Sequence, residues 1–263
     1  CTEMDNTEMV IKLISCEVFT REVCQCVADS PNVIDLEFTP KDAHNKPDSL
    51  RELLQERIDA ASSSARGYDA IALCLGVCGT STVGLKSRGI PVVMPRAHDC
   101  CTLYLGSKER FKEHFGDRPS TGFSAVGYIE HGNGMDLVRE ADDVRRQMGM
   151  DASYADLVEK YGEENAAYIW ETLSKTNERL ASDPIVFIDM PGVDGTTHVK
   201  ACQAAAESQG KPFERLTGDL SFIRALVSGE WNKEDFLVIT EGEEIGGVYD
   251  LDEVVTAVTA TPD

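Results

Sequence analysis

Short apolar runs of strand length alternate with segments of helical spacing through the first part of the chain. The runs at 9–15, 33–38, 70–75 and 90–94 are typical of buried strands. Apolar positions at helical spacing between and after them predict helices over about 17–29, from 48 onward, near 79–81 and over 98–114. This alternation predicts an α/β fold with a doubly wound, mostly parallel sheet of Rossmann-like type.

The pattern changes in the second part of the chain. Residues 121–128 predict an edge strand, and residues 136–181 predict helices interrupted near Gly149 and Gly162. Strand and helix signals then return. The expected strands are 184–190, 213–216 and 236–239, and the expected helices are about 197–208 and 220–228. The last twenty residues are acidic and rich in glycine, which predicts a loosely held tail.

Because strand signals return only after the long helical stretch, we expect three parts. These are an N-terminal α/β lobe over 1–135, a helical insertion over 136–182, and a second, smaller β/α lobe with the acidic tail over 183–263.

Charge and cysteine content narrow the classes of function. The 263 residues carry a formal net charge of −21, which argues against nucleic acids and anionic membranes as partners. A small-molecule substrate is expected. No apolar run approaches the roughly 20 residues that span a bilayer, and the polar N-terminal residues do not resemble a signal peptide. We therefore expect a cytoplasmic protein with reduced thiols. Nine cysteines without a regular framework favour metal or catalytic roles over disulfides.

Four side chains with metal-binding chemistry follow predicted strands. Cys16 ends the first strand, Cys78 follows the third, and His98 and Cys100 follow the fourth. Since ligands of parallel sheets collect at the carboxyl ends of the strands, we expect these side chains to meet there. Three thiolates and one imidazole suit zinc, and iron or an iron–sulfur cluster is the alternative. Chance burial of small cysteine side chains is the competing interpretation.

The other cysteines have simpler interpretations. Cys74 lies inside a strand and is expected in the core. Cys101 adjoins Cys100 and points about 100° away on a helix, so it is the reserve ligand. The remaining three are expected to pack against other residues: Cys24, Cys26 and Cys202.

Three carboxylates are candidates for catalytic roles. Asp99 could orient His98 or cap the following helix. Glu17 could be a ligand or a base, or simply an acidic residue at a helix start. Glu130, together with His131, follows a predicted strand and could approach the site, or it lies on the surface.

The segment 76–84, GVCGTSTVG, resembles a glycine-rich loop that enters a helix and could bind a phosphate or carboxylate of a cofactor. Its candidate binding residues are Gly76, Gly79, Thr80 and Ser81. It lacks both the GxxxxGK[ST] and the GxGxxG pattern, so the alternative is a turn that permits close backbone approach. No His–Asp relay accompanies Ser81, which argues against a serine hydrolase.

Several longer segments carry a family resemblance. ISCEVF at 14–19, GYDAIALCLGVCGTSTVGLKS at 67–87, PVVMPRAHDCCTLYLGSKERF at 91–111 and TGDLSFIRALVSGEW at 217–231 resemble the domain of unknown function 1638 family of anaerobic bacteria and methanogenic archaea. The resemblance covers nearly the whole chain. The family pattern falls on the four candidate ligands, Cys16, Cys78, His98 and Cys100, and not on Cys74 or Cys101.

The resemblance implies a context in one-carbon metabolism, because members of the family often occur beside corrinoid proteins and corrinoid-dependent methyltransferases. The first hypothesis is a zinc-dependent methyltransferase that moves a methyl group from a corrinoid or folate to a thiol-type acceptor, with a corrinoid protein or methyltransferase subunit as partner. The alternative is a non-enzymatic accessory or sensor protein that binds a metal, a cluster or a corrinoid. A third hypothesis is a purely structural zinc. An open coordination position favours the enzyme, and a saturated Cys₃His site favours the accessory protein.

Overall fold

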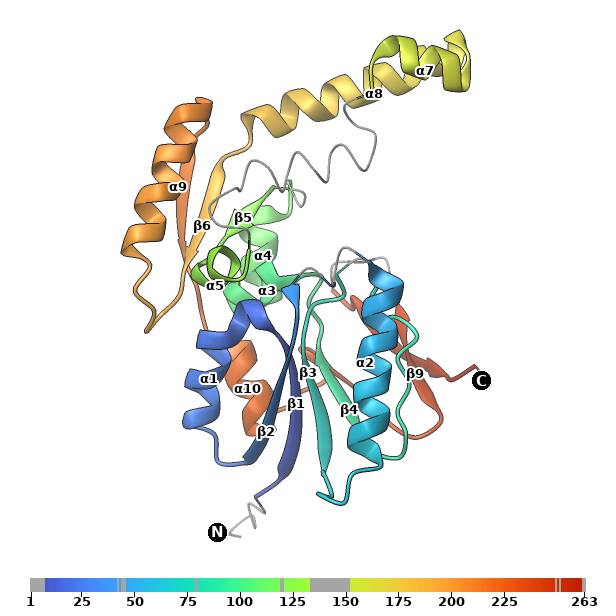
Figure 1. The fold of residues 1–263 in the computed structure, drawn as a ribbon, viewed down its shortest axis with the longest axis vertical. Coiled ribbons are helices and arrows are strands. Elements are labelled where there is room, and N and C mark those ends of the chain that lie inside the picture. Colours follow the sequence, from blue (N-terminus) through green and yellow to red (C-terminus); the bar gives the residue numbers. More distant parts are fainter. Residues whose placement is uncertain are drawn as a thin grey trace. The chain divides into compact units, whose positions relative to one another are not determined.

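The fold is described from a computed structural model, which covers residues 8–41, 43, 46–78, 80–118, 121–132, 152–248, 250 and 252–261. The chain divides into two compact units (Figure 1). The first unit contains Cys1–Asp117, Met190–Val193 and Thr217–Asp263, and the second contains Arg118–Asp189 and Asp194–Leu216.

The first unit is built on a five-stranded sheet with the order β2-β1-β3-β4-β8. Strands β1 to β4 are parallel, and β8 pairs antiparallel with β4 at the edge. The elements of this unit are β1 (Val10–Cys16), the 3₁₀ helix η1 (Glu17–Phe19), α1 (Thr20–Ala28), β2 (Val33–Thr39), α2 (Pro47–Ser62), β3 (Ala70–Cys74), β4 (Val92–Pro95), α3 (Cys100–Leu105), α4 (Lys108–Phe115), α10 (Ser221–Ser228), β8 (Phe236–Ile239), β9 (Glu243–Gly247) and β10 (Val255–Thr259).

The order of the strands confirms the expected mixed α/β fold with a mostly parallel sheet. Strand β3 lies in the middle of the sheet, and all five of its residues are buried because helices cover its faces. Helices α1 and α10 pack against each other, and α10 also contacts β3 and β4. From β1 the chain moves outward to β2 and then returns across β1 to β3, so the direction of winding reverses between β1 and β3.

The last part of the chain differs from expectation. The stretch 183–263 does not form one lobe, because α10 and β8 to β10 belong to the first unit while β6, α9 and most of β7 belong to the second. The expected loose tail instead forms the antiparallel hairpin β9–β10. Arg96 holds this hairpin, since its Nη1 donates hydrogen bonds to the carbonyl oxygens of Glu253, at 2.8 Å, and of Val255.

Two predicted helices also differ. The single helix expected over 98–114 is two helices, α3 and α4, because Gly106 adopts φ 75° and Ser107 caps α4 through a hydrogen bond from Arg110 N to Ser107 Oγ. The short helix expected near 79–81 is wrong for the described residues, where 80–84 form turns.

The second unit contains a three-stranded sheet with the order β5-β6-β7, in which β5 and β6 are parallel. Its elements are β5 (Phe123–Ser124), α5 (Val126–Glu130), α7 (Tyr154–Tyr161), α8 (Glu163–Ser182), β6 (Ile185–Asp189), α9 (Thr196–Gln209) and β7 (Phe213–Thr217). The edge strand expected over 121–128 is therefore only two residues long and continues as a helix. The expected interruption at Gly162 is confirmed, and that near Gly149 lies outside the described residues.

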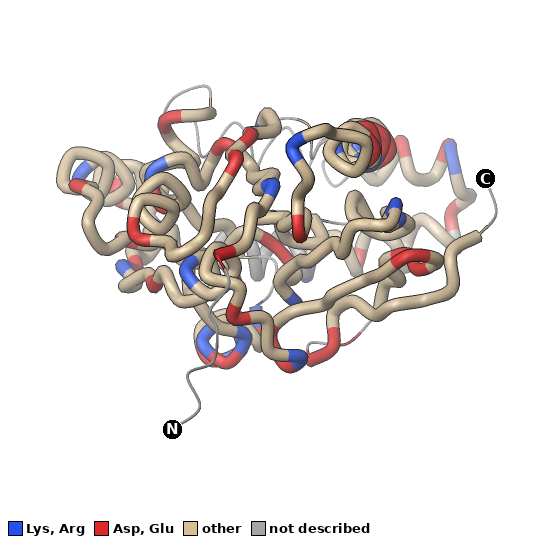
Figure 2. Tube along the Cα trace, turned by 90° about the horizontal axis from the view of Figure 1, so that it is seen from below, with Lys and Arg blue, Asp and Glu red and all other residues tan. Residues whose placement is uncertain are grey.

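The acidic charge is distributed rather than gathered. Figure 2 shows Asp and Glu on many of the described elements, interspersed with Lys and Arg. Within the described part of the chain, no helix has the length and apolar character needed to cross a bilayer.

Candidate functional site

The three predicted thiol ligands lie at the carboxyl ends of the parallel strands. Cys16 is the last residue of β1, Cys78 lies in the loop that follows β3, and Cys100 begins α3 after β4. Strands β1 and β3 are neighbours, and the winding reverses between them. A crevice outside the strand ends forms at such a reversal, which is where open α/β sheets bind ligands.

The three thiols form a chain of side-chain interactions with Cys100 in the middle. The pKa of Cys16 is raised by a hydrogen bond with Cys100 and by burial. For Cys100 the interaction with Cys16 favours the thiolate, but a second hydrogen bond with Cys78 and burial outweigh it, and its pKa is raised well above the usual range. Without a nearby cation, Cys16 and Cys100 are therefore held as neutral thiols. We call Cys16, Cys78 and Cys100 the thiol cluster.

A close crossing of two backbone segments sets the spacing between Cys78 and Cys100. Val77 N donates to Ala97 O at 2.9 Å, and Cys78 N donates to His98 O at 3.0 Å. At Gly76 an added Cβ would lie 2.5 to 2.8 Å from backbone atoms of Asp99, closer than carbon atoms approach in proteins. Only glycine fits there, so Gly76 acts through close packing, the alternative interpretation offered above for the glycine-rich loop.

Cys78 itself is held in an unusual backbone conformation. Its φ is 44°, in the left-handed region that non-glycine residues rarely adopt, and Ser81 Oγ donates a hydrogen bond to its carbonyl oxygen at 3.0 Å. Such conformations cost about 1 to 3 kcal/mol and are enriched at functional sites. Cys78 is half-buried, whereas Cys16 is 7% and Cys100 4% exposed. Solvent therefore reaches the thiol cluster mainly at Cys78.

His98 lies on the same segment as Cys100. Its Nε2 is buried and has no hydrogen-bond partner among the described residues. The ring centroid lies 6.2 Å from that of Phe111, and the side chain is within electrostatic range of Asp99 and Asp250. A buried unpaired imidazole nitrogen is costly, and a bound ligand or ion would satisfy it.

The chemistry of these donors fits a thiophilic metal ion, since three thiols and one imidazole form a zinc ligand set. The side chains are not preassembled, however. In the described parts of the chain, no group of three or more His, Cys, Asp or Glu side chains is placed so that it could hold a metal ion. An ion would therefore have to displace the thiol protons and draw the side chains closer than they stand.

The three candidate carboxylates have separate positions. Asp99 caps α3, since its Oδ1 accepts hydrogen bonds from Thr102 N at 3.1 Å and Thr102 Oγ1 at 3.3 Å, and burial raises its pKa. Glu17 Oε1 accepts a hydrogen bond from the backbone N of Lys41 at 2.7 Å. Glu130 is exposed at the end of α5, in the second unit.

The candidate phosphate loop does not have the expected form. Residues 80–84 form turns, so no helix N-terminus is available there to bind an anion. The carbonyl oxygen of Thr80 accepts a hydrogen bond from Arg51 Nη2 at 2.8 Å, and the hydroxyl of Ser81 is used within the loop. Gly79 lies outside the described residues.

The remaining cysteines lie largely where expected. Cys74 is fully buried in β3, and Cys26 and Cys202 are buried on their helices, as predicted. The prediction that Cys24 packs against other residues is wrong, because Cys24 is exposed on α1. Burial and the charge of Asp99 raise the pKa of Cys101, which is also buried.

Two buried polar side chains near the thiol cluster, Glu22 and Tyr104, are not predicted from the sequence. Glu22 and Tyr104 are fully buried, and Tyr104 is within electrostatic range of Glu22, Cys16 and Cys100. The hydroxyl of Tyr104 donates to Val18 O at 2.7 Å. A signal existed for Glu22, because it lies four residues from both Val18 and Cys26 and therefore shares their buried helix face.

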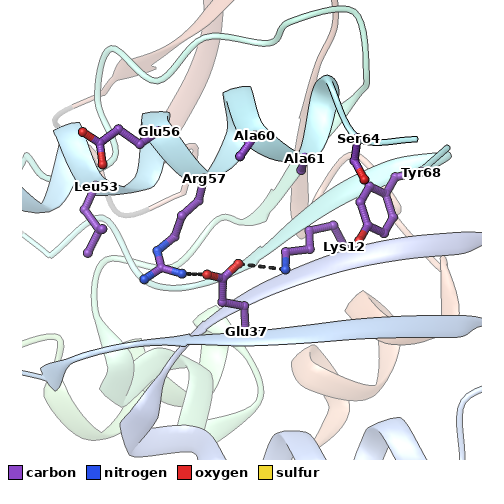
Figure 3. Close-up of a pocket in the computed structure, with 9 residues that line it drawn as sticks. All are labelled: Lys12, Glu37, Leu53, Glu56, Arg57, Ala60, Ala61, Ser64 and Tyr68. Carbon is purple, nitrogen blue, oxygen red and sulfur yellow. Dashed lines mark ion pairs between the residues drawn. The ribbon is translucent and has the colours of Figure 1, made fainter. Parts of the chain in front are cut away.

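A cavity of about 410 Å³ lies away from the thiol cluster, between α2 and the first two strands (Figure 3). Lys12 and Arg57 both form ion pairs with Glu37 there, the former at 2.7 Å. Burial lowers the pKa of Lys12. One carboxylate thus pairs with two cations, and partly exposed pairs of this kind contribute at most about 1 kcal/mol each.

Together, the sheet and the thiol cluster define a mixed α/β protein with cysteine thiols at the switch point of a mostly parallel sheet. The chain belongs to the family described as "Protein of unknown function (DUF1638)", which matches residues 38–227 and so includes Cys78, His98 and Cys100 but not Cys16. No curated protein and no solved structure shows a significant match.

Proposed function

We propose that Cys16, Cys78 and Cys100 bind one zinc ion as thiolates, and that this centre serves methyl transfer to a thiol-type acceptor. The observation that carries the proposal is the chain of interactions that joins the three thiols at the strand ends. Iron is the alternative metal. The same topology supports a doubly wound, Rossmann-like sheet, whose switch point is the usual ligand site.

Zinc, when bound, would supply the positive charge that stabilises the three thiolates and the anion of an acceptor thiol. The protein's own residues have defined tasks in this proposal. Cys16 and Cys100 exclude water from the inner side of the site because they are buried, and Cys78 lies on the side that solvent and acceptor reach. The Gly76–Asp99 crossing fixes the distance between the two loops.

The methyl donor and the partner come into the proposal from the family resemblance. A corrinoid or folate would donate the methyl group, and a corrinoid protein or methyltransferase subunit would present it. In the transfer, the acceptor sulfur forms a bond to the methyl carbon as the bond between that carbon and the donor breaks.

A metal analysis tests the proposal. The full chain is purified without oxygen, and its zinc and iron are measured by mass spectrometry beside Cys78→Ala and Cys24→Ala variants. Cys24 is the matched control because it is exposed and lies away from the strand ends. About one zinc or iron per chain, lost in Cys78→Ala and kept in Cys24→Ala, supports the site, and methyl transfer to thiols is then assayed. Equal metal content in all three proteins, or none, overturns it.

The unpaired Nε2 of His98 favours a second candidate function, a non-enzymatic accessory or sensor protein. In this alternative His98 is the fourth ligand and completes a closed Cys₃His site that leaves no position for a substrate. A His98→Gln variant separates the two. The enzyme hypothesis expects zinc to be retained. The accessory hypothesis expects at least tenfold weaker retention, because even the loss of an outer partner of a metal ligand lowers metal affinity about 10- to 100-fold, and His98 would bind the metal directly.

A further inference from the structure

We propose that Cys78 and Cys100 are a reversible disulfide pair, formed by exchange with a low-molecular-weight disulfide such as oxidised glutathione. This inference rests on the placement of the thiols alone and holds whether or not the thiol cluster binds a metal.

The two thiols are neighbours where their loops meet. Their side chains are close enough to share a hydrogen bond, and all the cysteines of the thiol cluster are free thiols. The backbone hydrogen bond from Cys78 N to His98 O and the close approach of Gly76 to Asp99 keep the two loops side by side. A disulfide needs such fixed proximity, because its Cβ atoms must lie about 3.5 to 4.5 Å apart.

The difference in exposure between the two thiols determines which of them reacts first. Cys78 is half-buried and is the member of the thiol cluster that an external disulfide can reach, whereas Cys16 and Cys100 are buried. Cys78 is therefore the entry thiol and Cys100, which interacts with it, is the resolving thiol. Cys101 is buried beside Cys100, but the interaction with Cys78 belongs to Cys100.

The exchange proceeds in two steps. The Cys78 thiolate attacks one sulfur of the small disulfide, a mixed disulfide forms, and one small thiolate leaves. That first small thiolate takes the proton of Cys100, and the resulting Cys100 thiolate attacks Cys78 Sγ. The Cys78–Cys100 bond forms, and the second small thiolate leaves and takes up the proton that Cys78 gave to solvent. Two protein thiols are oxidised, and one small disulfide is reduced to two thiols.

The test uses the full chain, treated with a chelator and incubated with oxidised glutathione. Remaining thiols are alkylated, and the tryptic peptides are analysed by mass spectrometry. Trypsin leaves Cys74 and Cys78 on the peptide 67–86, and Cys100 and Cys101 on the peptide 97–108. We expect these two peptides to be joined, with two thiols lost per chain, and dithiothreitol to reverse the link.

Serine variants of the four cysteines on these two peptides identify which two cysteines form the link. The link is expected to persist in Cys74→Ser and Cys101→Ser, and to fall to background in Cys78→Ser and Cys100→Ser. A link that survives in Cys78→Ser, or glutathione that stays on Cys78 in the unaltered chain without an internal link, overturns the proposal. Because the protein carries no metal in this experiment, a missing disulfide would not bear on the zinc site, and a missing zinc site would not bear on the disulfide.

Discussion

The Gly76–Asp99 crossing gives the sharpest prediction, a Gly76→Ala substitution. The added methyl group would lie 2.5, 2.6 and 2.8 Å from the Cα, C and N atoms of Asp99. These are backbone atoms, so no side-chain rotation relieves the contact, and the two segments must separate. Two backbone hydrogen bonds join the same segments, from Val77 to Ala97 and from Cys78 to His98, and separation stretches both.

The expected loss in the free energy of unfolding can be estimated from these contacts. Ordinary contact for a Cβ begins near 3.4 Å, so the segments must move apart by about 0.9 Å at the closest atom. Overpacking of this kind costs about 1 to 3 kcal/mol, and each weakened hydrogen bond adds up to about 1 kcal/mol. We therefore expect Gly76→Ala to lower the free energy of unfolding of the first unit by about 3 kcal/mol. The thiol of Cys100 should also become more accessible, because Cys100 directly follows Asp99, whose backbone the added methyl group displaces.

The assay is urea denaturation followed by tryptophan fluorescence in a Trp170→Phe background. This leaves Trp231, whose Nε1 donates to Leu226 O at 2.9 Å, as the reporter in the first unit. Thiol labelling of the native protein is measured in parallel. Gly247→Ala is the control, since its Cβ would meet only the Val83 side chain, at 3.2 Å, and should change stability by less than about 0.5 kcal/mol. If Gly76→Ala matched this control in both stability and labelling, the close crossing would be refuted.

Two further predictions concern the hairpin and the pH dependence of stability. Arg96→Met removes the donors to the Glu253 and Val255 carbonyl oxygens. The rate of amide hydrogen exchange in β10 should therefore rise by tenfold or more, while the amides of β3 stay protected. Equal protection of β10 in the variant and the unaltered chain would contradict this prediction. Burial raises the pKa of Cys26 and Cys202 from 9.0 to about 11, so the stability they provide as neutral thiols is complete below pH 9 and is lost as the pH rises to about 11. Each thiol should therefore contribute about 1 kcal/mol to the loss of stability between pH 8 and pH 10, measured by urea denaturation. A Cys26→Ala variant should lose correspondingly less over this range, and an unchanged pH dependence would contradict the assignment.

Local pattern predicted the parallel part of the sheet because each strand there is a short apolar run between turn residues. The structure of the C-terminal region is harder to predict from the sequence. Strand β8 pairs antiparallel with β4 across more than a hundred residues, and nothing in its own sequence indicates that partner. The hairpin β9–β10 is acidic and rich in glycine like a mobile tail, but Arg96 and the backbone hydrogen bond from Gly84 N to Ile245 O hold it.

The thiol cluster could be anticipated for a related reason. Parallel strands end at the same edge, so cysteines after neighbouring strands are brought together, and the structure places Cys16, Cys78 and Cys100 accordingly. Their role as metal ligands stays a prediction. What the sequence could not predict is the contact of Gly76 with Asp99, since a glycine in a loop gives no sign of which backbone segment it meets.

X-ray absorption at the zinc edge on the zinc-loaded full chain measures which atoms of the protein bind the metal. A zinc ion bound by the thiol cluster should show three sulfur atoms at about 2.3 Å, plus one lighter atom from His98 or an exchangeable ligand. A shell of nitrogen and oxygen atoms only, at about 2.0 to 2.1 Å, would place the metal elsewhere and contradict the account.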